Sequence, residues 1–286
     1  MASSRFQFTK MHGLGNDYVY VDMRNERMAD PVATARVVSD RHRGIGSDGL
    51  ILIHPSDSAD ARMEMYNADG SRAQMCGNGI RCVAKFAVEN GFAGGPTLRI
   101  DTDDGVKQAE VVSAGAGPTR VRIDMGKPQL AASSLPCTIS GERVVDHPLM
   151  LRVDNGDSLE VRMTGVSMGN PHATVFVDNV EMFDLHRWGP LLENAPEFPE
   201  RVNAHFVEVI SRAHVRVRTW ERGSGPTKAC GTGACAVVVA GALTERCDRR
   251  ATTTLPGGDL EIDWSDDDHV YMTGPAEEVF RGTWGG

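Results

Sequence analysis

Apolar and polar residues alternate along much of the chain, and this period-two pattern predicts β-strands with one face against a core. In the first half the alternating segments cover residues 18–22, 61–66, 97–101, 107–112 and 120–125. In the second half they cover residues 159–164, 174–177, 206–210, 215–220 and 259–264. Strands are therefore expected to dominate both halves.

Helical periodicity is confined to a few short segments. Between Ile80 and Val88 apolar residues recur at i, i+3, i+4, i+7 and i+8, and Asn90-Gly91 supplies a stop signal. Residues 234–243 are apolar all round, which predicts a helix surrounded by protein. Residues 31–39 and 184–193 predict two more helices. We therefore expect an α/β (α+β) fold in which each half rolls a mainly antiparallel sheet around a central helix.

The two halves carry the same residue types at one offset. Cys76 and Cys230 are 154 residues apart and each precedes Gly-x-Gly; the pairs Asn16/Asn170, Gly49/Asn203 and Asn67/Glu221 share this offset. The segment 15–22 also resembles 169–178, with two extra residues in the second copy. A repeat of this length predicts a duplicated domain, because solenoid units have periods of roughly 20–50 residues. Residues 127–140 contain Pro and Ser and are the expected crossover.

Length, composition and charge limit the number of domains and the classes of partner that this chain can have. The chain has 286 residues, which suffice for two domains, with 41% apolar and 24% charged residues. Its net charge of −9 argues against nucleic acid or an anionic membrane as the main partner. We see neither a signal-peptide pattern nor an apolar run of the roughly 20 residues that span a bilayer, so we expect a cytoplasmic protein. Its six cysteines are expected to be free thiols.

Cys76 and Cys230 are the candidate catalytic residues. Each stands where a buried helix is expected to begin, and the unpaired N–H groups of a helix start favour a thiolate and also bind carboxylates. A single cysteine before glycine is usually a small buried residue, but duplication at matching positions favours catalysis. Cys82 and Cys235 are expected to pack inside the helices. The cysteine spacings do not match a zinc site, so we expect no metal.

Several polar residues have both a functional and a structural interpretation. His172 follows the turn-forming Asn170-Pro171, and a loop histidine is the simpler interpretation. Glu221-Arg222, before a flexible glycine-containing loop, resembles a surface ion pair when taken alone. Asn67 begins a strong turn sequence. Neither the P-loop pattern nor the dinucleotide-binding pattern appears in the necessary context.

At these residues the chain resembles the diaminopimelate epimerase family over essentially its whole length. The motifs that carry the resemblance are 11–17 (MHGLGND), 66–71 (YNADGS), 75–82 (MCGNGIRC), 169–172 (GNPH), 221–223 (ERG) and 229–233 (ACGTG). The resemblance implies a cofactor-independent isomerase that interconverts LL- and meso-diaminopimelate for lysine and peptidoglycan synthesis. It also implies two pseudo-symmetric domains, residues 1–130 and 131–275, with residues 276–286 returning to the first, and a homodimer.

The resemblance also assigns roles to residues. Cys76 and Cys230 would be the two acid/base residues, assisted by His172 and Glu221. The substrate would be held by Asn16, Asn67, Asn170, Asn203 and Arg222, and its reacting carboxylate by Gly77, Asn78, Gly231 and Thr232. Some family members have a substrate-contacting glutamine where this chain has Gly49, so we expect that contact to be lost, made by backbone, or replaced by a neighbour such as Asn16.

Two alternatives remain open. A proline or hydroxyproline racemase of the same fold is the nearest, although such enzymes carry histidine where Asn78 stands and need no clamp for a distal group. The second is a non-catalytic amino-acid-binding protein on the duplicated scaffold, against which the presence of both cysteines argues. A two-base reaction would use one cysteine as thiolate and the other as thiol, from opposite faces of the substrate carbon.

Overall fold

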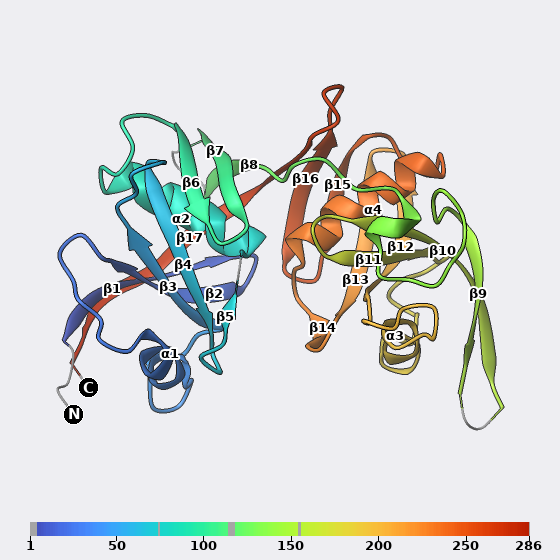
Figure 1. The fold of residues 1–286 in the computed structure, drawn as a ribbon, viewed down its shortest axis with the longest axis horizontal. Helices are drawn as coiled ribbons and strands as arrows, with labels where there is room; N and C mark the ends of the chain where they lie inside the picture. Colours follow the sequence, from blue (N-terminus) through green and yellow to red (C-terminus); the bar gives the residue numbers. More distant parts are fainter. Residues whose placement is uncertain (1–4, 74, 114–117, 154–155, 286) are drawn as a thin grey trace. The chain divides into compact units, whose positions relative to one another are not determined.

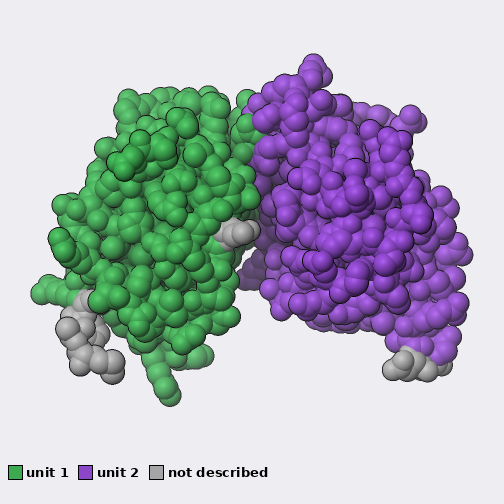
Figure 2. All heavy atoms as spheres, viewed as in Figure 1, with its two compact units in different colours: residues 1–124, 273–286 green, residues 125–272 purple. Residues whose placement is uncertain are grey.

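The chain forms two compact units (Figure 2). The computed structural model describes residues 5–73, 75–113, 118–153 and 156–285. Unit 1 comprises residues 1–124 and 273–286, and unit 2 comprises residues 125–272. The long strand β17 (Val270–Trp284) begins in unit 2 and continues through unit 1. Within unit 2, its first residue exchanges backbone hydrogen bonds with Met125 and Gly126.

Unit 1 is a closed ring of strands around a helix (Figure 1). β17 pairs with β1 and β8 and so closes the ring. Around the ring run β1 (Phe6–Gly13), β2 (Asn16–Asp22), β3 (Gly49–His54), β4 (Ala61–Asn67), β6 (Thr97–Thr102), β7 (Gly105–Ser113), β8 (Thr119–Asp124) and β17. Helix α2 (Gly77–Glu89) contacts β1, β2, β4, β6, β7 and β8, which places it inside. Helix α1 (Pro31–Ser39) packs on β3 and β4, and the short strand β5 (Arg72–Ala73) pairs antiparallel with β4.

Unit 2 repeats this arrangement. Its strands pair in the order β9 (His147–Arg152), β10 (Ser158–Ser167), β11 (Pro171–Phe176), β12 (Asn203–Ser211), β13 (His214–Glu221), β15 (Arg250–Leu255) and β16 (Gly258–Trp264). Helix α4 (Gly231–Leu243) contacts β10, β11, β12, β15 and β16. Helix α3 (Leu185–Glu193) packs on β9, β12, β13 and β14 (Gly225–Thr227), and η1 (Ala132–Ser134) precedes β9. The expected rolled sheet around a central helix is confirmed.

Strand registers show how closely the units correspond. In the parallel pair β2–β3, Tyr18 lies opposite Gly49, and in β11–β12 His172 lies opposite Asn203. Both pairs obey the offset of 154, and so do the first residues of α2 and α4. The hairpin β15–β16 repeats β6–β7 at an offset of 153. The expectation of two extra residues in the second copy is therefore wrong, because β2 and β11 match without an insertion and the offset is still 154 at β3 and β12.

Some elements escaped the period-two analysis. β3 reads GLILIH, an apolar run without alternation, because α1 covers one face of it and the interior of the ring the other. β1, β9 and β15 were also missed. The helix expected over residues 234–243 is confirmed: α4 is buried from Gly233 to Gly241. Within the described ranges, no helix has the length and apolar character needed to cross a membrane.

Candidate active site

Cys76 is the N-cap residue of α2 and is half-buried. Its Sγ accepts a hydrogen bond from the backbone N–H of Gly79 at 3.4 Å and donates one to Oδ1 of Asn16 at 3.3 Å. Nδ2 of Asn78 also reaches this oxygen, at 3.4 Å. Asp48 accepts from the Asn16 amide at 2.8 Å and so keeps Oδ1 turned toward the thiol. The structure thus brings together three predicted residues, with Asp48 as a support that the sequence did not indicate.

A buried cation also lies near the start of α2, just after its first turn. Arg81 is fully buried, and its guanidinium donates to the carbonyl oxygen of Gly77 at 3.1 Å and to Oδ1 of Asn78 at 3.0 Å. It also donates to the carbonyl oxygen of Pro275 in the same unit, at 3.1 Å. Arg81 therefore holds the helix start rigid and adds positive charge near Cys76. Arg81 was not among the residues predicted for the site, although a charged side chain within a predicted core helix is unusual and indicates a specific role.

Cys230 is the N-cap residue of α4 and is 8% exposed. Burial raises the pKa of its thiol well above 9.0, and the neighbouring Glu221 raises it further. The N–H of Gly233 and the hydroxyl of Thr232 lower the pKa by less. The helix start does favour the thiolate of Cys230, but the loss of hydration outweighs this effect and raises the pKa overall.

Glu221 ends β13 beside Cys230. Burial raises the pKa of its carboxyl above 4.5, and hydrogen bonds from Thr227 and Cys230 lower it by less. The Thr227 hydroxyl donates to Oε1 of Glu221 at 2.6 Å. The following loop is held by Glu193, which accepts from the N–H of Gly223 at 2.8 Å and from Nε1 of Trp220 at 2.7 Å. Glu193 and Thr227 are supporting residues that the sequence analysis did not identify.

His172 lies inside unit 2 rather than in an exposed loop. Its Nε2 is 2.9 Å from Oδ1 of Asn170, and its Nδ1 is 2.9 Å from Nε2 of His205. Burial lowers the pKa of His172 well below 6.5, with smaller contributions from His205 and Arg222. The ring is therefore neutral near pH 7, so any assistance that His172 gives comes from a neutral imidazole.

Asn203, Arg222 and Asn67 are anchored within their own units. Asn203 donates to the carbonyl oxygen of Pro171 at 2.9 Å and accepts from the backbone N–H of Arg222 at 3.0 Å. The guanidinium of Arg222 donates to the carbonyl oxygen of Glu200 at 3.3 Å. Asn67 donates to Ser71 at 2.9 Å, as its structural interpretation predicts.

Gly49 has no room for a side chain. A Cβ there would lie 2.1 Å from the carbonyl oxygen of Tyr66 and 2.9 Å from Cε1 of Tyr18. The Gly49 carbonyl already accepts from Ser47 at 2.9 Å. Tyr18 thus fills space that a side chain at position 49 would otherwise enter.

The four remaining candidates are the helix-start residues that follow the cysteines. Gly77 and Asn78 form the first turn of α2, and Gly231 and Thr232 form that of α4. All six cysteines are free, and Cys82 and Cys235 are buried in the helices, as expected. Among the residues with described positions, no group of three or more His, Cys, Asp or Glu is placed to hold a metal ion.

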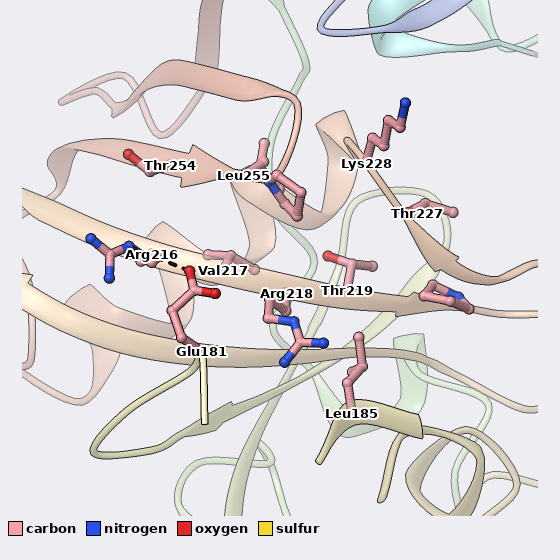
Figure 3. A pocket seen from close by; sticks show the side chains of 12 residues that line it. Glu181, Leu185, Arg216, Val217, Arg218, Thr219, Thr227, Lys228, Thr254 and Leu255 are labelled. Atoms are coloured by element: carbon pink, nitrogen blue, oxygen red, sulfur yellow. Dashed lines mark ion pairs between the residues drawn. The ribbon is translucent and has the colours of Figure 1, made fainter. Parts of the chain in front are cut away.

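Unit 2 also contains a cavity of about 510 Å³ (Figure 3). Arg216, Arg218 and Lys228 line it together with apolar residues such as Leu185 and Leu255. None of the predicted site residues is among its lining. Its lining does include Thr219 and Thr227, whose hydroxyls hydrogen-bond to His205 and Glu221 respectively.

Solved structures with the same fold belong to several kinds of protein. A phenazine biosynthesis protein of the PhzF family from Bacillus anthracis superposes with a TM-score of 0.69 at 16% identity, covering 98% of each chain. A hydroxyproline epimerase from Agrobacterium vitis gives a TM-score of 0.66 at 15% identity, covering 98% of this chain and 92% of that one. At these identities the likeness concerns the fold alone.

Sequence relatives are far more similar. Residues 8–131 and 164–279 match the family described as diaminopimelate epimerase. A diaminopimelate epimerase of Desulforudis audaxviator is 50% identical over 280 residues, which cover 97% of this chain and 99% of the relative. One from Acetivibrio thermocellus is 49% identical over 277 residues, covering 96% and 97%. With the paired cysteine-capped helices and full-length similarity, the chain belongs to the diaminopimelate epimerase family.

Proposed function

We propose that this protein is a cofactor-independent epimerase that interconverts LL- and meso-2,6-diaminopimelate. One observation carries the proposal: two cysteines cap the central helices of two units that share strand register. A duplicated acid/base group suits a reaction that removes a proton from one face of a carbon and returns one on the other. Family membership supports this substrate over other amino acids.

In the proposed reaction the α-carboxylate binds the N–H groups at the starts of α2 and α4, where backbone donors favour negative charge. Cys76 acts as thiolate and removes the α-proton from one stereoisomer, while Cys230 donates its thiol proton from the other face. The raised pKa of Cys230 supports its role as the acid in this direction. The buried guanidinium of Arg81 favours negative charge on the Cys76 side.

For the reverse reaction Cys230 must lose its proton first. Glu221 is the proposed acceptor, because its carboxyl lies beside Cys230, receives a hydrogen bond from the thiol, and has a pKa that burial raises above 4.5. The proton passes from the Cys230 thiol to the Glu221 carboxylate, leaving a thiolate and a neutral acid, and the Cys76 thiolate takes up a proton from water so that it can serve as the acid. Thr227, which donates to Glu221, keeps the carboxyl in position.

The distal end of the substrate is assigned to the remaining polar residues. Arg222 would pair with the distal carboxylate, since a guanidinium binds a carboxylate bidentately. Asn16, Asn67, Asn170 and Asn203 would bind the other polar groups. Gly49 offers no side chain, so we assign it no contact beyond backbone.

The proposal is tested by incubating the purified protein with LL-diaminopimelate and resolving the stereoisomers. We expect the meso form to accumulate to equilibrium without added cofactor. L-proline and trans-4-hydroxy-L-proline serve as comparison substrates, and turnover of these instead would favour the racemase alternative. Absence of turnover with measurable binding of diaminopimelate would favour the binding-protein alternative.

The two-base mechanism has its own test in deuterated water. During a first turnover, the meso product should carry deuterium at the inverted carbon while remaining substrate keeps its hydrogen, because different thiols serve the two faces. Return of the original hydrogen to the product would indicate a single base. We also propose a cytoplasmic homodimer acting in lysine and peptidoglycan synthesis; light scattering of the purified protein measures the dimer directly.

A further inference from the structure

A chain of hydrogen-bonded polar side chains runs through the interior of unit 2, beneath the start of α4. It leads from Asn170 to His172, then to His205 and finally to Thr219. The three links measure 2.9, 2.9 and 3.0 Å. Both histidines are fully buried and Thr219 is 2% exposed. His205 and Thr219 play no part in the mechanism proposed above.

The protons in this chain follow from the chemistry of neutral imidazole. Burial lowers the pKa of His205 to about 3 and that of His172 well below 6.5, so each ring carries one proton near pH 7. Oδ1 of Asn170 is an acceptor, which places the His172 proton on Nε2. Nδ1 of His172 must then accept, so His205 donates from its own Nε2. Nδ1 of His205 accepts from the Thr219 hydroxyl, and every link has one donor and one acceptor.

We infer that His205 is a positioning residue: its Nε2–H holds His172 in the Nε2–H tautomer, which in turn keeps the Asn170 amide turned with its oxygen inward and its NH₂ group outward. The NH₂ group can donate to a carboxylate, whereas a reversed amide would present an oxygen and repel it. This inference rests on the proposed function, in which Asn170 binds the substrate. His205 therefore acts on substrate binding through two intermediaries.

A purely structural role is the competing explanation. An added Cβ on Gly233 would lie 2.3 Å from Cε1 of His205 and 3.0 Å from Sγ of Cys230, so the ring packs under the helix start that carries the thiol. If His205 served only as packing, its loss would displace Cys230 and lower kcat. Loss of the Asn170 orientation would instead raise KM.

The tautomers are read directly by nitrogen NMR of the unmodified protein labelled with ¹⁵N-histidine, since protonated and bare ring nitrogens have distinct chemical shifts. Near neutral pH we expect both buried histidines to carry the proton on Nε2. A proton on Nδ1 of His172 would overturn the inference, whatever the activity. If the protein fails to epimerise diaminopimelate while both tautomers are as expected, the proposed function fails and the hydrogen-bond chain stands.

Variants at position 205 complete the test. His205→Leu removes the donor, and an aliphatic side chain is compatible with this place in the fold because the matching residue of unit 1 is Ile51, also fully buried. We expect KM to rise about tenfold with kcat within about threefold, and His172 to change tautomer. His205→Gln, which keeps an N–H donor, should recover much of the loss. Thr253→Val is the matched control, because Thr253 is a buried threonine of unit 2 that does not belong to the hydrogen-bond chain.

Two outcomes would contradict this role. A fall in kcat alone for His205→Leu would make the residue a packing element under Cys230. An equal loss in His205→Gln and His205→Leu would show that the donor is irrelevant. If the leucine variant does not fold, the tautomers of the unmodified protein and the glutamine variant still decide the question.

Discussion

The starts of α2 and α4 share one backbone design but have opposite charge around their cysteines. Near Cys76 lies the buried cation Arg81, whose counterpart in unit 2 is the buried Cys235. Near Cys230 lies the carboxylate of Glu221, whose counterpart in unit 1 is Asn67. Matching backbones therefore place a cysteine at each helix start, while the inner side chains around the two thiols differ in charge.

The buried side chains at three aligned positions on the strands also differ between the two units. The three aligned positions on β2–β4 hold Tyr18, Ile51 and Met65, whereas those on β11–β13 hold His172, His205 and Thr219. All six side chains are buried. At these three positions unit 1 has a tyrosine and two apolar side chains, whereas unit 2 has a directional hydrogen-bond chain, which specifies proton positions as well as shape.

The strongest test of the comparison removes each thiol separately. Cys76→Ala and Cys230→Ala should each lower the epimerisation rate by about a thousandfold or more, because acid–base groups contribute roughly 10²–10⁴ each. Cys82→Ala and Cys235→Ala should retain most of the activity, since these thiols lie inside the helices. Stereoisomer analysis measures all four. A Cys230→Ala protein with nearly unchanged turnover would break the two-thiol assignment.

Arg222 distinguishes the units at the substrate's distal end, because its counterpart in unit 1 is Ala68. Arg222→Ala should lower kcat/KM for diaminopimelate about 10- to 100-fold, the effect of losing one charge-assisted hydrogen-bonded pair. Circular dichroism should show an unchanged fold. Arg212→Ala is the control, because Arg212 is exposed and pairs with Asp248 at 2.7 Å. Equal kinetics for the two variants would remove Arg222 from the site.

The third prediction concerns stability at the matching glycines Gly79 and Gly233. A Cβ at Gly233 meets the ring of His205 at 2.3 Å, whereas one at Gly79 meets the flexible end of Ile51 at 2.9 Å. Gly233→Ala should lower the free energy of unfolding by about 2–3 kcal/mol, and Gly79→Ala by about 1 kcal/mol or less. Urea denaturation measures both. Equal losses of unfolding free energy would mean that the His205 ring moves aside as readily as the flexible end of Ile51.

The smallest expected effect is a difference in acid sensitivity. The folded pKa of His205 is about 3 and that of His172 is also lowered, against 6.5 for an ordinary histidine. The stability that these neutral rings confer is complete above pH 6.5 and is lost as the pH falls from there toward 3. Their counterparts Tyr18 and Ile51 do not titrate in this range. Hydrogen exchange between about pH 7 and pH 4 should therefore show α4 and β12 losing protection before α2 and β3 do; the reverse order would contradict it.

Much of the fold was readable from periodicity. The four helices and most strands were predicted because their apolar residues follow a regular pattern or, in α4, form a continuous apolar run. β3 was missed because it is covered on both faces. His205 was missed for a different reason: its strand was expected to begin at residue 206, which left the buried position 205 outside the predicted element. The two cysteines and the polar residues Asn16, Asn67, Asn170, Asn203 and Glu221 were found because duplication marks them at one offset.

By itself the sequence determined the duplication, the positions of both cysteines at helix starts and the family, since these depend on spacing along the chain. The tertiary structure decided the state of each group. Whether Cys230 is a thiol, whether His172 is neutral and which way Asn170 turns depend on burial and on partners such as Glu221 and His205. Such partners come from different strands, and only folding brings them within hydrogen-bonding distance.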